Sequence, residues 1–261
     1  MVEVNISRID VSTGKVSRMI DFVAEEKPLH LFLGRTRYAT VYCSPINLKE
    51  LAVGHLLSEG VVKSVAEIEE VSLREDEGFC NVKLKRDIDV EKRLKFLKSY
   101  SRVIYSACGG RSSYQFVGKL PKVKSSLKVK AEVIMRCVNR LNYDAKVFRK
   151  TGGMHVAAVF RSDGSVVALA EDVGRHNAVD KVVGMGALEK IDFATCFLAL
   201  SGRLTGDIVF KAARIGLPIV ASLAAAIDSG IAVAKNTSLT LVGFVRGNRM
   251  NVYHRADRIS I

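Results

Sequence analysis

The segment Val166–Lys181 reads VVALAEDVGRHNAVDK, and it contains the pattern that decides the fold of this chain. A β-prone apolar run over Val166–Ala170 is followed by two carboxylates and by a Gly-Arg-His motif at residues 174–176. An apolar stretch with helical character begins at about Asn177. A strand that leads into a helix in this way is typical of α/β proteins. Such junctions hold anions because free helix N–H groups and the helix dipole favour negative charge.

The same alternation continues on both sides of this segment, so residues 131–261 are expected to form one α/β domain. Apolar spacing of three and four residues between Val133 and Leu141 predicts a helix. Other helices are expected up to about Gly216 and over Ser229–Asn236. The strands expected are His155–Phe160, Val166–Ala170, Phe193–Leu200, Pro218–Ser222, Leu239–Val245 and Met250–Tyr253.

Residues 1–104 are expected to form a small α+β subdomain. Alternating apolar residues bounded by turn signals predict β-hairpins, and an Asn followed three residues later by Glu is typical of a helix start. The expected elements are a hairpin over residues 29–43, a helix over 48–59 after Asn47, a short helix after Ser64 and a hairpin over 71–84.

The two units are joined by residues 105–130, where Gly, Ser and Lys interrupt the apolar periodicity. We predict a flexible basic loop here, long enough to be functional. Cys108 lies in it, next to two glycines and three residues before Arg111. Positive surroundings lower the pKa of a thiol, which favours a reactive cysteine. The alternative is a tolerated surface cysteine, and this motif alone does not exclude it.

Composition points to an ordinary globular protein of the cytoplasm. Hydrophobic residues make up 48% and charged residues 26% of the 261-residue chain. The first residues lack the basic start and following apolar block that mark a signal peptide. No apolar stretch is long enough to span a bilayer comfortably, so no membrane partner is expected. The five cysteines include no C-x-x-C pair, which fits a reducing compartment.

The net charge of +13 is concentrated in one part of the chain. Residues 83–150 hold 19 Lys and Arg against 5 Asp and Glu, which leaves 21 basic and 22 acidic residues elsewhere. Such a block suits a polyanionic partner, such as a phosphorylated cofactor, nucleic acid or an acidic protein surface. A solvated basic face is the alternative. Aromatic residues are not interleaved with these charges, so nucleic acid is not the favoured partner.

Three further segments have the composition of ligand-binding loops. A double glycine precedes His155, and Ser201-Gly202-Arg203 follows a predicted strand at its ligand-binding end. Two arginines flank the tight turn in residues 244–249, which suits phosphate. Each segment also has an ordinary interpretation as a turn with solvated side chains. The residue patterns of zinc deaminases, Walker A loops and G-x-S-x-G elbows are missing, so metal or nucleotide hydrolysis has little support and no resident metal is expected.

Taken in order, these segments resemble the FdhD/NarQ family, the sulfur carriers for formate dehydrogenase maturation. The resemblance covers nearly the whole chain, including the cysteine loop. Its blocks are Lys27–Leu29, Lys49–Gly60, Thr151–His155, Glu171–Lys181, Ser201–Arg203 and Leu241–Gly247.

The resemblance implies a C-terminal three-layer αβα domain like that of cytidine deaminases, and a homodimer. It also implies a sulfurtransferase activity: a cysteine desulfurase delivers persulfide sulfur to Cys108. The carrier then passes it to a molybdenum- or tungsten-bis(molybdopterin guanine dinucleotide) cofactor before insertion into apo-formate dehydrogenase. A guanine nucleotide such as GDP would mimic that cofactor. The implied binding residues are Gly152, Gly153, His155, Gly174, Arg175, His176, Arg203, Phe244, Val245, Arg246, Gly247, Asn248 and Arg249.

The sequence departs from the family pattern in the cysteine loop. The family usually has C-G-x-C, whereas this chain has Cys108-Gly109-Gly110-Arg111. One sulfur is enough to carry a persulfide, and Arg111 could stabilise its anion by charge. The missing second cysteine also leaves open a cofactor-binding chaperone that moves no sulfur. A second departure is the segment Ala224–Asp228, where the family tends to have a more polar sequence.

Overall fold

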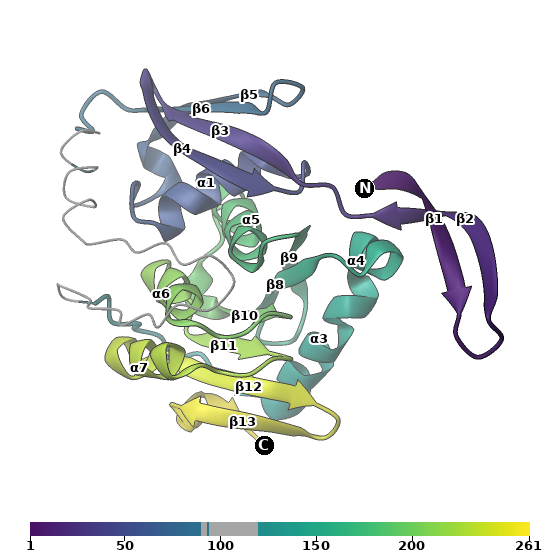
Figure 1. The fold of residues 1–261 in the computed structure, drawn as a ribbon. Helices are drawn as coiled ribbons and strands as arrows, with labels where there is room; N and C mark the ends of the chain where they lie inside the picture. Colours follow the sequence, from purple (N-terminus) through teal and green to yellow (C-terminus); the bar gives the residue numbers. More distant parts are fainter. Residues whose placement is uncertain (90–92, 94–119) are drawn as a thin grey trace.

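The computed structural model describes residues 1–89, 93 and 120–261, and its centre is a six-stranded sheet in the C-terminal half (Figure 1). The strand order is β13-β12-β11-β10-β8-β9. Strands β10, β11 and β12 run parallel, and β8 is antiparallel to β10. The strands are β8 (His155–Arg161), β9 (Val166–Asp172), β10 (Cys196–Leu200), β11 (Ile219–Ser222), β12 (Thr240–Arg246) and β13 (Arg249–His254).

Helices cover both faces of this sheet. In β8, Ala157 and Val159 belong to one apolar cluster, whereas Val156, Ala158 and Phe160 belong to another, as the two-residue period of a strand requires. The expected α/β class with three layers is therefore confirmed. On the second cluster's side lies α3 (Ala131–Asp144); on the first side lie α5 (Arg175–Leu188), α6 (Gly206–Arg214) and α7 (Asp228–Thr237).

The N-terminal part contributes a four-stranded sheet, ordered β4-β3-β6-β5, and the helix α1 (Leu48–Ser58). Helices α1 and α5 cross very closely: a Cβ on Gly54 would lie 1.7 Å from the carbonyl oxygen of Asp180, and one on Gly184 would lie 1.9 Å from that of Glu50. One continuous apolar core joins the two parts. The strands are β3 (Lys27–Leu33), β4 (Thr36–Cys43), β5 (Ile68–Arg74) and β6 (Phe79–Leu84).

A two-stranded hairpin of β1 (Val2–Asp10) and β2 (Lys15–Val23) extends from the body of the molecule (Figure 1). It is not among the elements expected from the sequence. A short helix, α4 (Lys146–Thr151), packs near its base and is also additional. The last residues form β14 (Ile259–Ser260), which pairs with β7 (Val129–Lys130).

Several expected boundaries need correction. Helix α5 begins at Arg175, not at Asn177, so the Arg-His pair forms its first turn. Residues Phe193–Thr195 form a 3-10 turn before β10. Asn47 precedes α1 in a left-handed conformation, not in the extended one usual for a capping residue, and its side chain makes no capping hydrogen bond; its backbone carbonyl accepts the first helical bond, from Leu51 N–H.

Of the predicted basic loop, residues 120–130 are described, and Cys108 lies outside the described residues. Within the described ranges, no helix combines the length and apolarity needed to cross a membrane.

Candidate anion-binding pocket

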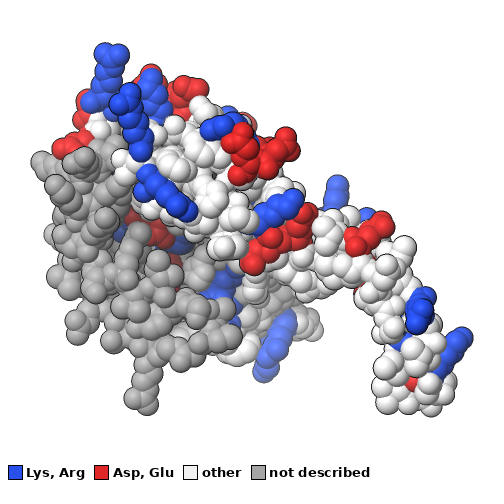
Figure 2. All heavy atoms as spheres, turned by 45° about the horizontal axis from the view of Figure 1, so that its top comes forward, with Lys and Arg blue, Asp and Glu red and all other residues white. Residues whose placement is uncertain are grey.

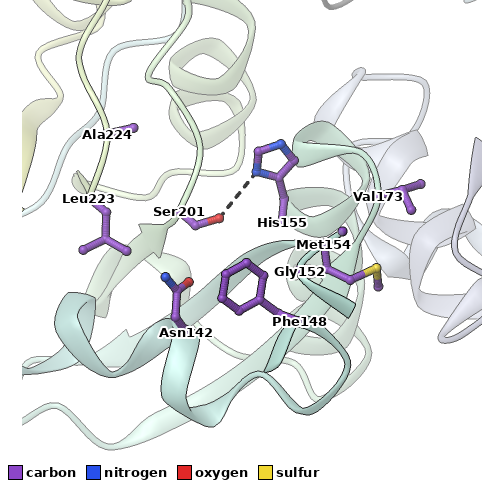
Figure 3. A pocket seen from close by; sticks show the side chains of 10 residues that line it. Asn142, Phe148, Gly152, Met154, His155, Val173, Ser201, Leu223 and Ala224 are labelled. Atoms are coloured by element: carbon purple, nitrogen blue, oxygen red, sulfur yellow. Dashed lines mark hydrogen bonds between the residues drawn. The ribbon is translucent and has the colours of Figure 1, made fainter. Parts of the chain in front are cut away.

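A pocket of about 450 Å³ opens at the carboxyl ends of β10 and β11, beside the first residue of β8 (Figure 3). Because β8 runs antiparallel to β10, His155 at its start lies next to Ser201, which follows β10. This is the sheet edge at which open α/β proteins bind ligands. The lining consists of Asn142, Phe148, Gly152, Gly153, Met154, His155, Val173, Ser201, Leu223 and Ala224.

His155 and Ser201 form the polar wall. Ser201 is fixed by two backbone bonds with Val156: its N–H donates to the Val156 carbonyl at 2.9 Å, and its hydroxyl accepts from the Val156 N–H at 3.0 Å. A longer contact of 3.5 Å joins the Ser201 hydroxyl to His155 Nδ1, and both side chains point toward each other in Figure 3. Ser201 was outside the set of predicted binding residues.

The pKa of His155 shows that this wall lies in a positive field. Burial lowers that pKa most, and the charges of Arg175 and Arg203 lower it further, against the opposing effect of Asp172. The imidazole is therefore neutral at neutral pH and offers one donor and one acceptor. The charges of two predicted binding residues, Arg175 on α5 and Arg203 in the loop after β10, thus reach the pocket.

Gly202 allows these groups to meet. A Cβ at Gly202 would lie 3.1 Å from the Cβ of Arg175 and 3.5 Å from His155 Nδ1. The predicted segments around residues 155, 175 and 202 therefore converge in space, although they lie far apart in the sequence.

The double glycine has two different roles. Gly152 ends α4 in the left-handed region, at a φ of 65°, where its N–H donates to the Phe148 carbonyl at 2.7 Å. An L side chain would be strained there. A Cβ on Gly153 would lie 3.0 Å from that of Ala24, so this glycine also admits the chain segment that follows the hairpin.

The carboxylates at the β9–α5 junction make ion-pair and hydrogen-bond contacts that stabilise the fold. Asp172 pairs with the fully buried Lys181 at 2.6 Å and accepts the N–H groups of Ser44 and Gly174 at 3.0 and 2.8 Å. Glu171 accepts two N–H groups at the start of α4, from Val147 at 3.0 Å and from Phe148 at 2.6 Å. These bonds fix Gly174 and the following Arg175 at the rim of the pocket.

His176 is not among the pocket-lining residues. Its Nε2 lies 4.0 Å from a carboxylate oxygen of Asp207 on α6. Burial, followed by the charges of Lys211 and Arg175, lowers its pKa to about 4. The side chain therefore faces a second group of charges, which includes Lys211 and Asp180, while its neighbour Arg175 acts on the pocket.

The predicted segment 244–249 lies at the end of β12, next to the pocket wall. Phe244 has a φ of 51°, and its N–H donates to the Ala224 carbonyl at 3.0 Å. The guanidinium of Arg246 lies 4.9 Å from the centre of the Phe244 ring. The Val245 side chain is buried in the core. The rest of the turn is exposed: Arg246, Gly247, Asn248 and Arg249.

Several lining residues carry no signal that sequence analysis detects. Asn142 is the clearest: its Oδ1 is buried and has no hydrogen-bond partner among the described residues. In the sequence it is one polar residue in the last turn of an amphipathic helix. No group of three or more His, Cys, Asp or Glu in the described ranges could hold a metal ion.

Fold and pocket together define an α/β protein with a glycine-lined pocket at the carboxyl edge of its central sheet. Comparison with known proteins gives the family: the chain belongs to the FdhD/NarQ family, whose model matches residues 24–260.

Relatives match over almost the full length. The chain is 37% identical over 262 residues to the sulfur carrier protein FdhD of Sulfolobus acidocaldarius, covering 99% of this chain and 98% of that one. It is 34% identical over 253 residues to the protein of the same name from Shouchella clausii, with coverage of 95% and 93%. A crystal structure from Desulfotalea psychrophila, described as a candidate formate dehydrogenase accessory protein, superposes with a TM-score of 0.78 at 25% identity over 99% of both chains.

Proposed function

We propose that this protein is a sulfur carrier in formate dehydrogenase maturation and that Cys108 carries the sulfur. Relatives that match it from end to end are named sulfur carrier proteins, which supports the role. The observation that supports the binding half of the proposal is the pocket wall: a Cβ on Gly202 would lie 3.1 Å from the Cβ of Arg175 and 3.5 Å from His155 Nδ1, and the charges of Arg175 and Arg203 add to burial in lowering the pKa of His155. A wall of this kind suits phosphate groups.

Loading with sulfur is a thiol–disulfide type of exchange. The Cys108 thiolate attacks the outer sulfur of a persulfide on a cysteine desulfurase. A sulfur–sulfur bond to Cys108 forms as that of the desulfurase breaks, and the desulfurase cysteine leaves as a thiolate. Arg111, three residues away, favours both the thiolate and the persulfide anion by its charge.

The substrate that receives the sulfur is the molybdenum- or tungsten-bis(molybdopterin guanine dinucleotide) cofactor of an apo-formate dehydrogenase. Arg175 and Arg203 would hold its phosphates, and the backbone at Gly152 permits close approach. Arg246 and Arg249 on the adjacent turn extend the cationic surface, and the Phe244 ring beside Arg246 offers an apolar face to a base. GDP is the simplest mimic of this ligand.

A second candidate function is supported by one observation. Arg111 stands where the family usually has a second cysteine. A chaperone that binds the guanine-dinucleotide cofactor without moving sulfur would need neither loop cysteine.

Intact-mass analysis after incubation with a desulfurase, cysteine and a persulfide-selective label tests the assignment. We expect one labelled sulfur on the wild type and none on Cys108→Ala. The control is Cys80→Ala, which removes a buried thiol whose pKa burial raises to about 11, and it should load like the wild type. Sulfur that persists on Cys108→Ala would overturn the carrier site. If that variant binds GDP and supports formate dehydrogenase activity like the wild type, the chaperone function is correct instead.

A further inference from the structure

Asn142 occupies an apolar position of its helix. The buried side of α3 includes Ile134, Val138 and Leu141, and Asn142 follows Val138 by four residues, which places the two on the same face. The Oδ1 of Asn142 is buried and has no hydrogen-bond partner among the described residues. A buried acceptor without a partner destabilises a fold. The amide is therefore costly to the protein unless a ligand completes its hydrogen bonds.

Two apolar side chains share this part of the pocket with Asn142. Phe148 and Leu223 both line the pocket, and both pack on the core beneath it while they stay partly exposed. Phe148 is held in place because its N–H donates to Glu171 at 2.6 Å and its carbonyl accepts from the Gly152 N–H at 2.7 Å. In Figure 3 the amide and the Phe148 ring point into the same part of the cavity. Apolar side chains with one amide suit a flat ring that has a polar edge.

The amide also defines the edge that it recognises. It presents an acceptor and donors side by side, so it is complementary to a ring N–H next to a ring carbonyl. Two hydrogen bonds can then form in one plane, as they do between Asn side chains and base edges. This lactam edge occurs in guanine, in hypoxanthine and in the pterin ring.

The opposite side of the pocket suits phosphate. In Figure 3, Asn142 lies on one side of the cavity and the His155 ring on the other. The charges of Arg175 and Arg203 act on His155. The pocket volume of about 450 Å³ lies within the range of small-molecule sites. A ligand can therefore span the pocket, with its ring at Asn142 and its phosphates near His155.

Building on the proposed function, we infer that Asn142 recognises the lactam edge of a ring that lies against Phe148 and Leu223. The Oδ1 atom accepts from the ring N–H, and Nδ2 donates to the ring carbonyl. The cofactor of the proposed function has this edge in its guanine bases and in its pterin rings. Both rings are candidates for this part of the pocket, and ligand binding distinguishes them.

Calorimetry with GDP and with inorganic pyrophosphate separates the two sides of the pocket. We expect the wild type to bind GDP more tightly than pyrophosphate. Asn142→Leu keeps a branched shape without hydrogen-bonding groups, so it should bind pyrophosphate like the wild type but GDP about 10- to 100-fold more weakly. In urea it should be at least as stable as the wild type, because an unpaired buried acceptor is removed.

Asn81→Leu is the matched control. The Oδ1 of Asn81 is also buried without a partner in the described ranges, but Asn81 lies on β6 of the N-terminal sheet. Figure 2 brings this part of the molecule forward and shows basic and acidic side chains next to each other, and Lys83 of β6 pairs with Glu69 at 2.7 Å. Mixed charges do not attract phosphate, so Asn81→Leu should bind GDP like the wild type.

Asn142→Asp tests the direction of the two hydrogen bonds. A carboxylate has acceptors and no donor, so it suits the ring N–H and the neighbouring amino group of guanine better than a ring carbonyl. GDP and IDP, which lacks this amino group, should bind the wild type alike. The Asp variant should bind GDP about tenfold more tightly than IDP. If Asn142→Leu loses GDP affinity but Asn142→Asp shows no such preference, the side chain acts through its shape and the inference is wrong.

Free pterin identifies the ring. If Asn142→Leu loses pterin binding but binds GDP like the wild type, the pterin ring is the one that Asn142 recognises. If this variant binds both GDP and pterin like the wild type, the inference is wrong while the proposed function stands. A wild type that binds none of the three probes would overturn the inference together with the cofactor-binding half of the proposed function. Persulfide loading of Cys108 tests the other half separately.

Discussion

The two regions on either side of the first turn of α5 handle charge in opposite ways. Arg175 acts on the pocket, and the next residue, His176, faces a group of buried and half-buried side chains that we call the polar cluster. It lies on α1, α5 and α6 and at the end of α1: His55, Ser58, Glu59, Asp180 and Lys211. In the cluster, Lys211 Nζ lies 2.7 Å from both carboxylate oxygens of Asp180.

The cluster holds its lysine against carboxylates, whereas the pocket wall consists of histidine, serine and glycine. Asp180 also accepts from the Ser58 hydroxyl at 2.6 Å and bonds His55 Nδ1 at 2.9 Å. The pKa of Asp180 is held below its usual range by Lys211 and His55 in spite of burial. In the pocket, two arginines act on a neutral histidine beside glycines. The ion pairs of the cluster hold α1, α5 and α6 together, whereas the pocket wall exposes polar groups to a cavity.

Breaking the cluster should have the largest effect on folding. Asp180→Asn leaves Lys211 buried with its charge poorly compensated, which costs on the order of 3–5 kcal/mol. Urea unfolding measures the loss. The control is Asp257→Asn in the exposed pair with Arg255, which should leave the free energy of unfolding close to that of the wild type. Similar losses in the two variants would contradict the assigned role of the cluster.

Removing the Arg175 side chain beside the pocket should weaken ligand binding and change the free energy of unfolding little. We expect Arg175→Ala to weaken GDP binding about 10- to 100-fold in calorimetry, because charged hydrogen bonds to phosphate are lost. The pKa of His155 should also rise, since the Arg175 charge lowers it, and NMR titration of the ring follows this change.

The control for that variant is Arg161→Ala, at the exposed far end of the same strand as His155. It should bind GDP like the wild type. If both variants bind equally well, the pocket is not the phosphate site.

The pH dependence of the free energy of unfolding should come from His176, which faces the polar cluster. His176 has a pKa of about 4 in the fold and about 6.5 when unfolded, so the unfolded chain binds more protons between these values. Stability is thus fully present above about pH 6.5 and falls as the pH drops toward 4. Between pH 7 and pH 5 we expect a loss on the order of 1–2 kcal/mol from this residue.

Urea unfolding of His176→Gln at both pH values checks this contribution. The variant should lose less stability than the wild type over that interval. His254→Gln is the control, because His254 is mostly solvated and its pKa is only modestly lowered. An unchanged loss in His176→Gln would remove His176 as the source.

The sequence predicts most strands and helices because apolar periodicity and turn residues act locally. Of the predicted binding residues, Gly152, Gly153 and His155 line the pocket, whereas His176 and residues 244–249 do not. Two features escape it. The alternation of Val2, Val4 and Ile6 fits a strand, but alternation ordinarily implies one buried face, and the described residues leave Val2 exposed and cover Val4 and Ile6 only in part. Asn142 has a role that depends on which way its helix faces, and tertiary packing decides that.

The smallest effect should come from adding a methyl group at Gly202, which lies against Arg175 at the start of α5. A Cβ at Gly202 lies at 3.1 Å from the Cβ of Arg175, a tight contact with an atom close to the backbone that cannot swing away. We expect Gly202→Ala to weaken GDP binding about threefold by displacing Arg175, with a loss of stability near 1 kcal/mol. Gly216→Ala is the control for stability, because its Cβ would meet no atom within 4 Å but its φ of 87° strains the backbone. It should lose stability and bind GDP normally. If Gly202→Ala binds like the wild type, Arg175 reaches the ligand independently of that loop, and the pocket and the cluster are coupled through α5 alone.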